Sequence, residues 1–343
     1  MSYPLRYDFT MLLRTYHKVT PAPLRRLLGR AVSRGVALHR DSESLRATWK
    51  NLAPVALARG WRTSAQRPTV CAVFVGRNDD YVPDNEARIR AMIEWNSQVM
   101  CDEMIFVEWN PPADRPLLSV AFARDYPHLR CYVVPAEIHS QVCEHPRMVI
   151  MEEFGKNVGV RRARSEYVCV TNAYIFWDAR VRRMLRLLDK NLIFRTRRVE
   201  WRWDGGPVTQ QSLTDARNRV AFRLGWKQEL DYGCGDFVLA SRDLWQRARG
   251  YDESLRATRI HADGRGLYQL IEAGGKPVHM GLHYHLFHES SSSLQGGVFT
   301  GESRFGAAFP YRENLPYTNP PDWGLADCAE EQVAERVWKL VRS

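Results

Sequence analysis

Short apolar runs alternate with helical patterns between residues 69 and 190, and this alternation constrains the fold more than any other feature of the chain. Four runs have the Val-, Ile- and Phe-rich composition of buried strands: Thr69–Val75, Met104–Glu108, Leu129–Val134 and Tyr167–Thr171. Between the first two, Asn85–Met100 carries apolar residues at helical spacing. Strands that alternate with helices predict an α/β fold with a mostly parallel, doubly wound sheet flanked by helices.

The stretch Glu152–Asp178 joins a basic helical pattern directly to the last of these strands. The strand ends in the polar pair Thr171-Asn172. Open α/β sheets bind ligands at the carboxyl ends of their strands. We therefore expect a ligand site beside Asn172.

The chain divides into three parts by composition. We expect a basic helical extension over residues 1–66, a main domain over 67–328 and a C-terminal helix over 329–343. Within the extension, residues 20–40 place leucines on one helical face and arginines on the other. Such a helix suits peripheral contact with an anionic membrane, and it equally suits a helix that caps the main domain.

Composition limits the partners and the compartment. The net charge of +10 attracts anions such as nucleic acid, acidic membranes or phosphorylated substrates. No nucleic-acid motif accompanies the charge, so we expect no nucleic-acid partner. Seven single cysteines and the lack of a signal peptide or a membrane span of about 20 apolar residues favour a cytoplasmic protein, at the inner membrane face if residues 20–40 bind lipid.

Glycine-rich phosphate loops are missing. The first strand is not followed by GxGxxG, and no GK[ST] occurs, which disfavours nicotinamide enzymes and ATPases. The strand ends instead in Arg77-Asn78-Asp79-Asp80. These side chains suit a ribose, a base edge or a phosphate, and they equally suit a capped turn.

Several motifs follow one another in a fixed order. They are RNDD, VEWNPP, EEFGKNVGVRRARSEYVCVTNAYI, GDFVLASRDLWQRARGYDE and HADGRGLYQLIEAGGKPVHM. The ordered set resembles the glycosyltransferases of the GT-A fold, bacterial family-2-like enzymes in particular, over residues 69–325. The resemblance implies a GT-A-type nucleotide-binding sheet.

The resemblance also implies roles for individual residues. Donor-binding residues would be Arg77, Asn78, Asp79, Glu108, Lys156, Asn157, Arg161 and Asn172. Gly235 and Asp236 would lie on the acceptor side, and Asp263 would be the general base. His285 or His288 would complete a metal site.

One departure from the family pattern concerns the metal. The Asp-x-Asp motif of the family is replaced by Asn172-Ala173-Tyr174, although Mg²⁺ and Mn²⁺ prefer anionic oxygen ligands. Asp178 either compensates as a ligand or caps the helix predicted to start at Ala179. Three interpretations stay open: weak divalent binding, direct neutralisation of the diphosphate by Lys156 and Arg161, or loss of activity.

The resemblance predicts a glycosyltransferase of the hexosyltransferase type. It would move a sugar from a nucleotide-sugar donor to a glycan, lipid or small-molecule acceptor, with inversion, in cell-surface glycan biosynthesis. Two alternatives are a degenerate GT-A domain that binds sugar nucleotide or glycan without turnover, and a nucleotidyltransferase.

Overall fold

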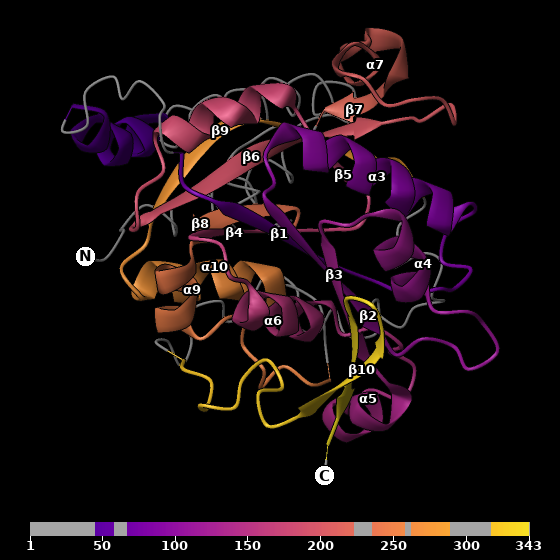
Figure 1. Ribbon diagram of the computed structural model, residues 1–343. Coiled ribbons are helices and arrows are strands. Elements are labelled where there is room, and N and C mark those ends of the chain that lie inside the picture. The colour runs from indigo at the N-terminus through magenta and orange to yellow at the C-terminus, as the bar shows by residue number, and fades with distance from the viewer. Residues whose placement is uncertain (1–44, 58–66, 223–234, 258–261, 289–316, 343) are drawn as a thin grey trace, which may run out of the picture.

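The computed structural model describes residues 45–57, 67–222, 235–257, 262–288 and 317–342. Their centre is an eleven-stranded sheet with the order β10-β11-β3-β2-β1-β4-β8-β6-β9-β5, in which β7 pairs with β6 (Figure 1). The strands are β1 Val70–Gly76, β2 Glu103–Trp109, β3 Leu129–Val134, β4 Tyr167–Thr171, β5 Ile175–Trp177, β6 Leu192–Trp201, β7 Arg219–Phe222, β8 Phe237–Ser241, β9 Lys276–Leu286, β10 Ala329–Ala334 and β11 Val337–Val341.

Helices cover both faces of the sheet (Figure 1). The α-helices are α3 Asn85–Val99, α4 Leu118–Asp125, α5 Ala136–Val142, α6 Glu152–Arg162, α7 Gln210–Thr214, α9 Arg242–Ala248 and α10 Ala262–Glu272. Two 3₁₀ helices are η1 Ala179–Arg186 and η2 Ala216–Asn218. The predicted α/β sheet flanked by helices is therefore confirmed, although the helix predicted after residue 178 is a 3₁₀ helix.

The parallel half of the sheet comprises β11, β3, β2, β1 and β4. Beyond β4 the pairing is mixed, because β8 runs antiparallel to both β4 and β6 while β9 runs parallel to β6. The prediction of a mostly parallel sheet thus holds on one side only.

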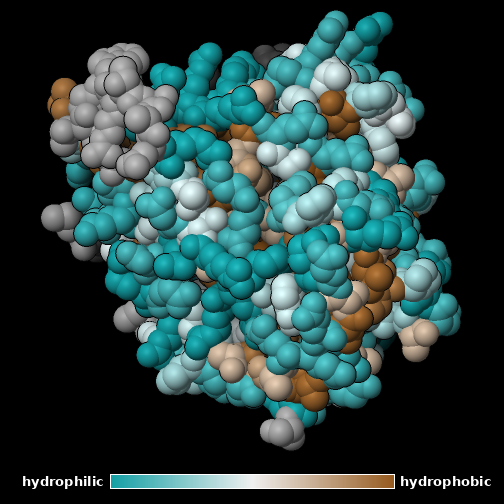
Figure 2. All heavy atoms as spheres, in the orientation of Figure 1, coloured by the Kyte–Doolittle hydropathy of each residue, from teal (hydrophilic) through white to brown (hydrophobic). Residues whose placement is uncertain are grey.

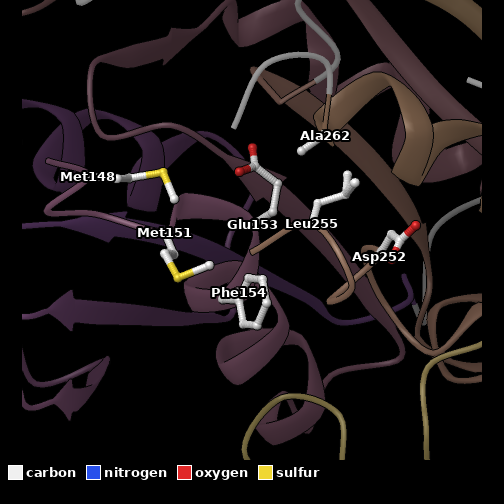
Figure 3. Close-up of a pocket in the computed structure, with 7 residues that line it drawn as sticks. All are labelled: Met148, Met151, Glu153, Phe154, Asp252, Leu255 and Ala262. Carbon is white, nitrogen blue, oxygen red and sulfur yellow. The ribbon is translucent and has the colours of Figure 1, made fainter. Parts of the chain in front are cut away.

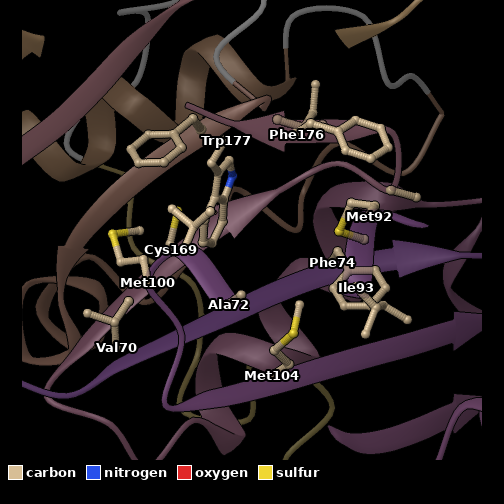
Figure 4. Close-up of a cluster of buried hydrophobic side chains, with 14 of the residues drawn as sticks. Val70, Ala72, Phe74, Met92, Ile93, Met100, Met104, Cys169, Phe176 and Trp177 are labelled. Carbon is tan, nitrogen blue, oxygen red and sulfur yellow. The ribbon is translucent and has the colours of Figure 1, made fainter. Parts of the chain in front are cut away.

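Strand β1 lies at the centre of the core and is buried on both faces, as in parallel sheets covered by helices. Val70, Ala72 and Phe74 pack toward α3 in the cluster shown in Figure 4. The intervening residues Cys71 and Val73 belong to the cluster on the opposite face, with α6 and α9. This alternation follows the two-residue period of a strand.

The C-terminal segment corrects a prediction. The helix expected over 329–343 is wrong, because the segment forms the β10–β11 hairpin, and β11 pairs in parallel with β3. Val337 and Leu340 are buried, and the ring of Trp338 stacks on Tyr132 with centroids 5.4 Å apart. Pairing with the open edge of β3 outweighs the local helical pattern, as tertiary context commonly does for Val- and Trp-rich segments.

The N-terminal extension is described only over 45–57, a helix that packs against β9. Thr48 accepts a hydrogen bond from the His279 amide at 3.0 Å, and Asn51 donates to the Pro277 carbonyl at 2.9 Å. Trp49 and Leu57 point outward, 70% and 84% exposed. Residues 20–40 lie outside the described part of the chain.

The visible surface is mostly polar. The face in Figure 2 is largely hydrophilic, and apolar side chains appear on it only in small groups. Among the described residues, no helix combines the length and apolarity that crossing a bilayer requires.

Helix α6 approaches β1 closely because two glycines face the sheet. A Cβ on Gly155 would lie 2.8 Å from Val75, and a Cβ on Gly159 would lie 2.3 Å from Val73. Acidic residues occupy the first turn of α6 and arginines the last, which suits the helix dipole. The glycines of the GKNVG motif therefore have a packing role.

Substituting Gly159→Ala tests this packing. We expect a loss of about 1–3 kcal/mol in the free energy of unfolding from the clash with Val73, despite a helix-propensity gain of about 1 kcal/mol. Urea unfolding measures the change. Gly206→Ala is the control, since its methyl group meets only the Asp204 side chain. Equal stability of both variants would contradict the close-packing role.

Candidate active site

Four residues from separate elements converge at the end of β4. They are Lys156 on α6, Asn172 after β4, Gly235 before β8 and Asp263 in the first turn of α10. A Cβ on Gly235 would lie 2.8 Å from Lys156 Nζ, 3.5 Å from Asn172 Oδ1 and 3.5 Å from Asp263 Cβ. The structure therefore brings together four of the residues that the sequence singled out.

Asp263 is held by backbone amides. Its Oδ2 accepts a hydrogen bond from the Gly235 amide at 3.0 Å, and its Oδ1 accepts one from the Gly264 amide at 2.8 Å. The carboxylate is thus fixed beside Gly235, and its place in the first turn of α10 also suits the helix dipole.

Lys156 is a buried cation surrounded by carboxylates. Its Nζ lies 3.1 Å from Glu152 and 3.9 Å from Glu153. Burial alone would lower the pKa of Lys156, but the charges of Glu152, Glu153 and Asp263 outweigh it and raise the pKa. Lys156 therefore stays protonated at neutral pH.

A small pocket opens beside this group. It is lined by Met148, Met151, Glu153, Phe154, Asp252, Leu255 and Ala262 (Figure 3). Two of the lining residues adjoin the four-residue group. Glu153 pairs with Lys156, and Ala262 directly precedes Asp263 in the chain. The remaining lining is largely apolar.

Asp236 is the centre of a buried polar network next to Asn172. It accepts hydrogen bonds from Asn172 Nδ2 at 3.1 Å and from Arg198 Nη1 at 2.9 Å, and His283 Nε2 lies 3.3 Å away. Burial would raise the pKa of Asp236, but Arg198 and His283 outweigh it and hold the pKa well below its usual value. Asp236 is therefore an ionised carboxylate with three polar partners.

The network continues from Arg198 to the histidines. Arg198 also donates to Glu200 at 2.8 Å, and Glu200 lies 2.8 Å from Nδ1 of His285. The His285 ring is 4.8 Å from that of His288. Burial, helped by the charge of Arg198, lowers the pKa of His285 to about 4, so His285 is neutral at pH 7.

The metal-binding prediction does not fit these contacts. Tyr174 donates its hydroxyl proton to Asn85 at 2.7 Å, and Asp178 caps η1 by accepting from the Arg180 amide at 2.9 Å. The part of the chain that the structure describes contains no group of three or more His, Cys, Asp or Glu side chains arranged to hold a metal. His285, His288 and Asp178 therefore do not form one coordination site, and the capping alternative for Asp178 is confirmed.

Three of the expected donor-binding residues make contacts within the protein, and a donor-binding role for them stays a prediction. Glu108 is buried and accepts from the amides of Leu118 and Ser119 at the start of α4, at 3.0 and 2.8 Å. Asn157 donates to the carbonyl of Tyr251 at 2.9 Å. Arg161 lies over the ring of Trp323 at 5.1 Å.

The turn after β1 is held by its own side chains. Arg77 pairs with Asp79 at 2.9 Å and donates to the Asn110 carbonyl at 2.6 Å. Asn78 donates to the Pro116 carbonyl at 2.7 Å. These contacts agree with the capped-turn alternative, and a donor-binding role for the three residues stays a prediction.

Sequence reasoning missed Arg198, Glu200 and Glu152. A signal was present for the first two, because Arg198 and Glu200 are two residues apart in an otherwise strand-like run and so share one face of β6. Charged side chains inside a central strand require partners, which the chain supplies from β8 and β9.

Comparisons with known proteins find matches among solved structures and not among family models or curated proteins. No protein-family model and no curated protein matches the chain. Similar solved structures include a mannosyltransferase from Pyrobaculum calidifontis in complex with GDP-Man and Mn²⁺, with 13% identity, a TM-score of 0.44, and coverage of 85% of this chain and 79% of that chain. Another is S. aureus TarS, with 10% identity, a TM-score of 0.41, and coverage of 64% of this chain and 37% of that chain. Similarity at this level does not define an activity.

Asn172→Asp tests the Asn172–Asp236 contact. The change replaces a donor by a second carboxylate about one hydrogen-bond length from Asp236, so we expect a loss of about 2–5 kcal/mol in the free energy of unfolding at pH 7.5. Asn172→Ala, which removes only the hydrogen bond, should cost about 1–2 kcal/mol. Urea unfolding in EDTA measures both, and an Asn172→Asp variant as stable as the wild type would refute the contact.

Acid should destabilise the fold through its buried histidines. Burial lowers the pKa of His279 to about 3 and that of His285 to about 4, whereas unfolded histidine titrates near 6.5. Between those values the unfolded chain binds more protons than the folded chain. The free energy of unfolding therefore decreases as the pH is lowered, by about 2 kcal/mol or more from pH 7.5 to pH 5. Urea unfolding against pH checks this, and His285→Gln should flatten the dependence.

Proposed function

We propose that the chain is a GT-A-type glycosyltransferase, related to bacterial family-2 enzymes, that moves a sugar from a nucleotide-sugar donor to a hydroxyl acceptor. The observation that carries the proposal is the placement of Asp263: its carboxylate is fixed by the Gly235 amide at 3.0 Å, beside Lys156 at the end of β4. A positioned carboxylate next to a buried cation at strand ends suits proton removal coupled to departure of an anion.

The reaction proceeds in one displacement. The acceptor oxygen bonds to the anomeric carbon of the sugar, and its proton passes to a carboxylate oxygen of Asp263. The bond from the anomeric carbon to the diphosphate oxygen breaks, and the nucleoside diphosphate leaves with the electron pair. A single displacement inverts the anomeric configuration.

Lys156 is the positive group that faces this site. Glu152 and Glu153 are its partners in this structure, and both belong to the same helix as Lys156. A donor diphosphate would compete with these carboxylates for the ammonium group. The acceptor would be a glycan or a lipid-linked sugar of the cell surface.

Binding without turnover is a second candidate. It is favoured by the hydrogen bonds of Asn172 to Asp236 and of Tyr174 to Asn85, which hold the residues that replace Asp-x-Asp away from a metal-binding role. This domain would bind a sugar nucleotide or a glycan. Binding of UDP-, GDP- or dTDP-sugars without product formation would support it over the transferase.

Asp263→Asn tests the general base. We expect transfer to fall by about 10²- to 10⁴-fold while donor binding persists, because an amide cannot take a proton, although it keeps only one of the two acceptors for the Gly235 and Gly264 amides. Product formation with a donor panel and calorimetric donor binding measure the two effects. Asp204→Asn is the control, since Asp204 also accepts a glycine amide, at 3.0 Å, in an exposed turn. Unchanged transfer by Asp263→Asn would remove Asp263 from the mechanism.

A further inference from the structure

Two buried polar atoms lie close to Gly235. Lys156 is fully buried, and its Nζ lies 2.8 Å from the point where a Gly235 Cβ would stand. Asn172 Oδ1 lies 3.5 Å from the same point and is buried without a hydrogen-bond partner among the described residues. Buried polar groups left unsatisfied are uncommon in folded proteins, so this atom calls for a partner.

The orientation of the Asn172 amide follows from its neighbour. Asp236 is an ionised carboxylate, which only accepts hydrogen bonds, so the amide nitrogen of Asn172 must face it at 3.1 Å. The carbonyl oxygen is thereby turned toward Gly235. An acceptor is left open on that side.

Lys156 retains donor capacity as well. Its ammonium group carries three N–H bonds, and the nearest carboxylate, that of Glu152, lies 3.1 Å away. The second carboxylate, Glu153, is at 3.9 Å, beyond hydrogen-bond distance. At least one N–H is therefore available on the side of Gly235.

Gly235 lets Lys156 approach its backbone closely. Among the described glycines, those with positive φ do not include Gly235, so its backbone conformation does not require glycine. A methyl group there would stand 2.8 Å from Lys156 Nζ, so one of the two groups would have to shift. The lack of a side chain at Gly235 therefore allows the ammonium group to lie here, near Asn172 Oδ1.

We propose that Lys156, Asn172 and Gly235 form a subsite for one hydroxyl group of a pyranose ring. The hydroxyl oxygen accepts a hydrogen bond from Lys156 Nζ, and its proton is donated to Asn172 Oδ1. A hydroxyl group is both donor and acceptor, and so matches this pair, whereas a phosphate oxygen offers nothing to the carbonyl. This subsite rests on the proposed function. It gives Asn172 the role of a hydrogen-bond acceptor for the sugar.

Gly235→Ala tests the subsite, with Gly206→Ala as the matched glycine control. Calorimetry compares binding of UDP-, GDP- and dTDP-sugars with binding of the corresponding nucleoside diphosphates. If the hydroxyl belongs to the donor sugar, Gly235→Ala should weaken nucleotide-sugar binding by about tenfold more than nucleoside diphosphate binding, which changes only as far as the methyl group displaces Lys156. If it belongs to the acceptor, donor binding should persist and the acceptor KM should rise by a similar factor.

Other outcomes overturn the subsite. If Gly235→Ala lowers the Tm but alters neither nucleotide-sugar binding nor the acceptor KM, the space holds a buried water only. A wild type that binds no sugar nucleotide would refute the proposed function, and the subsite with it. Should Gly235→Ala fail to fold by circular dichroism, Asn172→Ala replaces it, because that change removes the carbonyl acceptor and should produce the same selective loss.

Discussion

The contacts of the buried Asp236 carboxylate hold the end of β4 in place. It stands at the start of β8, the first antiparallel strand after the parallel half, and it joins β6 through Arg198 and β9 through His283. An ionised carboxylate in the interior is stable only with such partners, and removing one partner of a buried pair typically costs about 3–5 kcal/mol. Asp236 therefore locks three strands together and also fixes Asn172 at the end of β4.

This lock determines what the end of β4 can bind. Asn172 presents an amide nitrogen to Asp236, and Tyr174 donates its hydroxyl proton to Asn85 on α3. Both neutral side chains are held by these hydrogen bonds at the positions of the Asp-x-Asp pattern. Among the described residues, Lys156 lies close to Gly235 and Asp263 and pairs with Glu152 and Glu153 on its own helix.

Sequence patterns predicted the parallel half of the fold closely. Leu129–Val134 and Tyr167–Thr171 are strands with those bounds, because buried strands have a local signature. The C-terminal hairpin was missed because its stability comes from the edge of β3, which local sequence does not reveal. Lys156, Asn172, Gly235 and Asp263, which the family resemblance singled out, lie close together, whereas Glu108, Asn157 and Arg161 bond to backbone groups or lie over a ring. Motif position alone does not distinguish these two fates.

Carboxylates in place of Asn172 or Tyr174 would disturb hydrogen bonds to other elements of the fold. A carboxylate at position 172 would face Asp236 across a contact that now measures 3.1 Å, and Asp236 is already committed to Arg198 and His283. A carboxylate at position 174 would leave Asn85 without the hydroxyl of Tyr174, while Asn85 still donates to the carbonyl of Arg77 at the end of β1. Each change to the metal motif therefore disturbs a hydrogen bond to another element. Asn172 is thus coupled to Asp236, and Tyr174 to Asn85. A substitution of either residue at the end of β4 therefore also affects its partner.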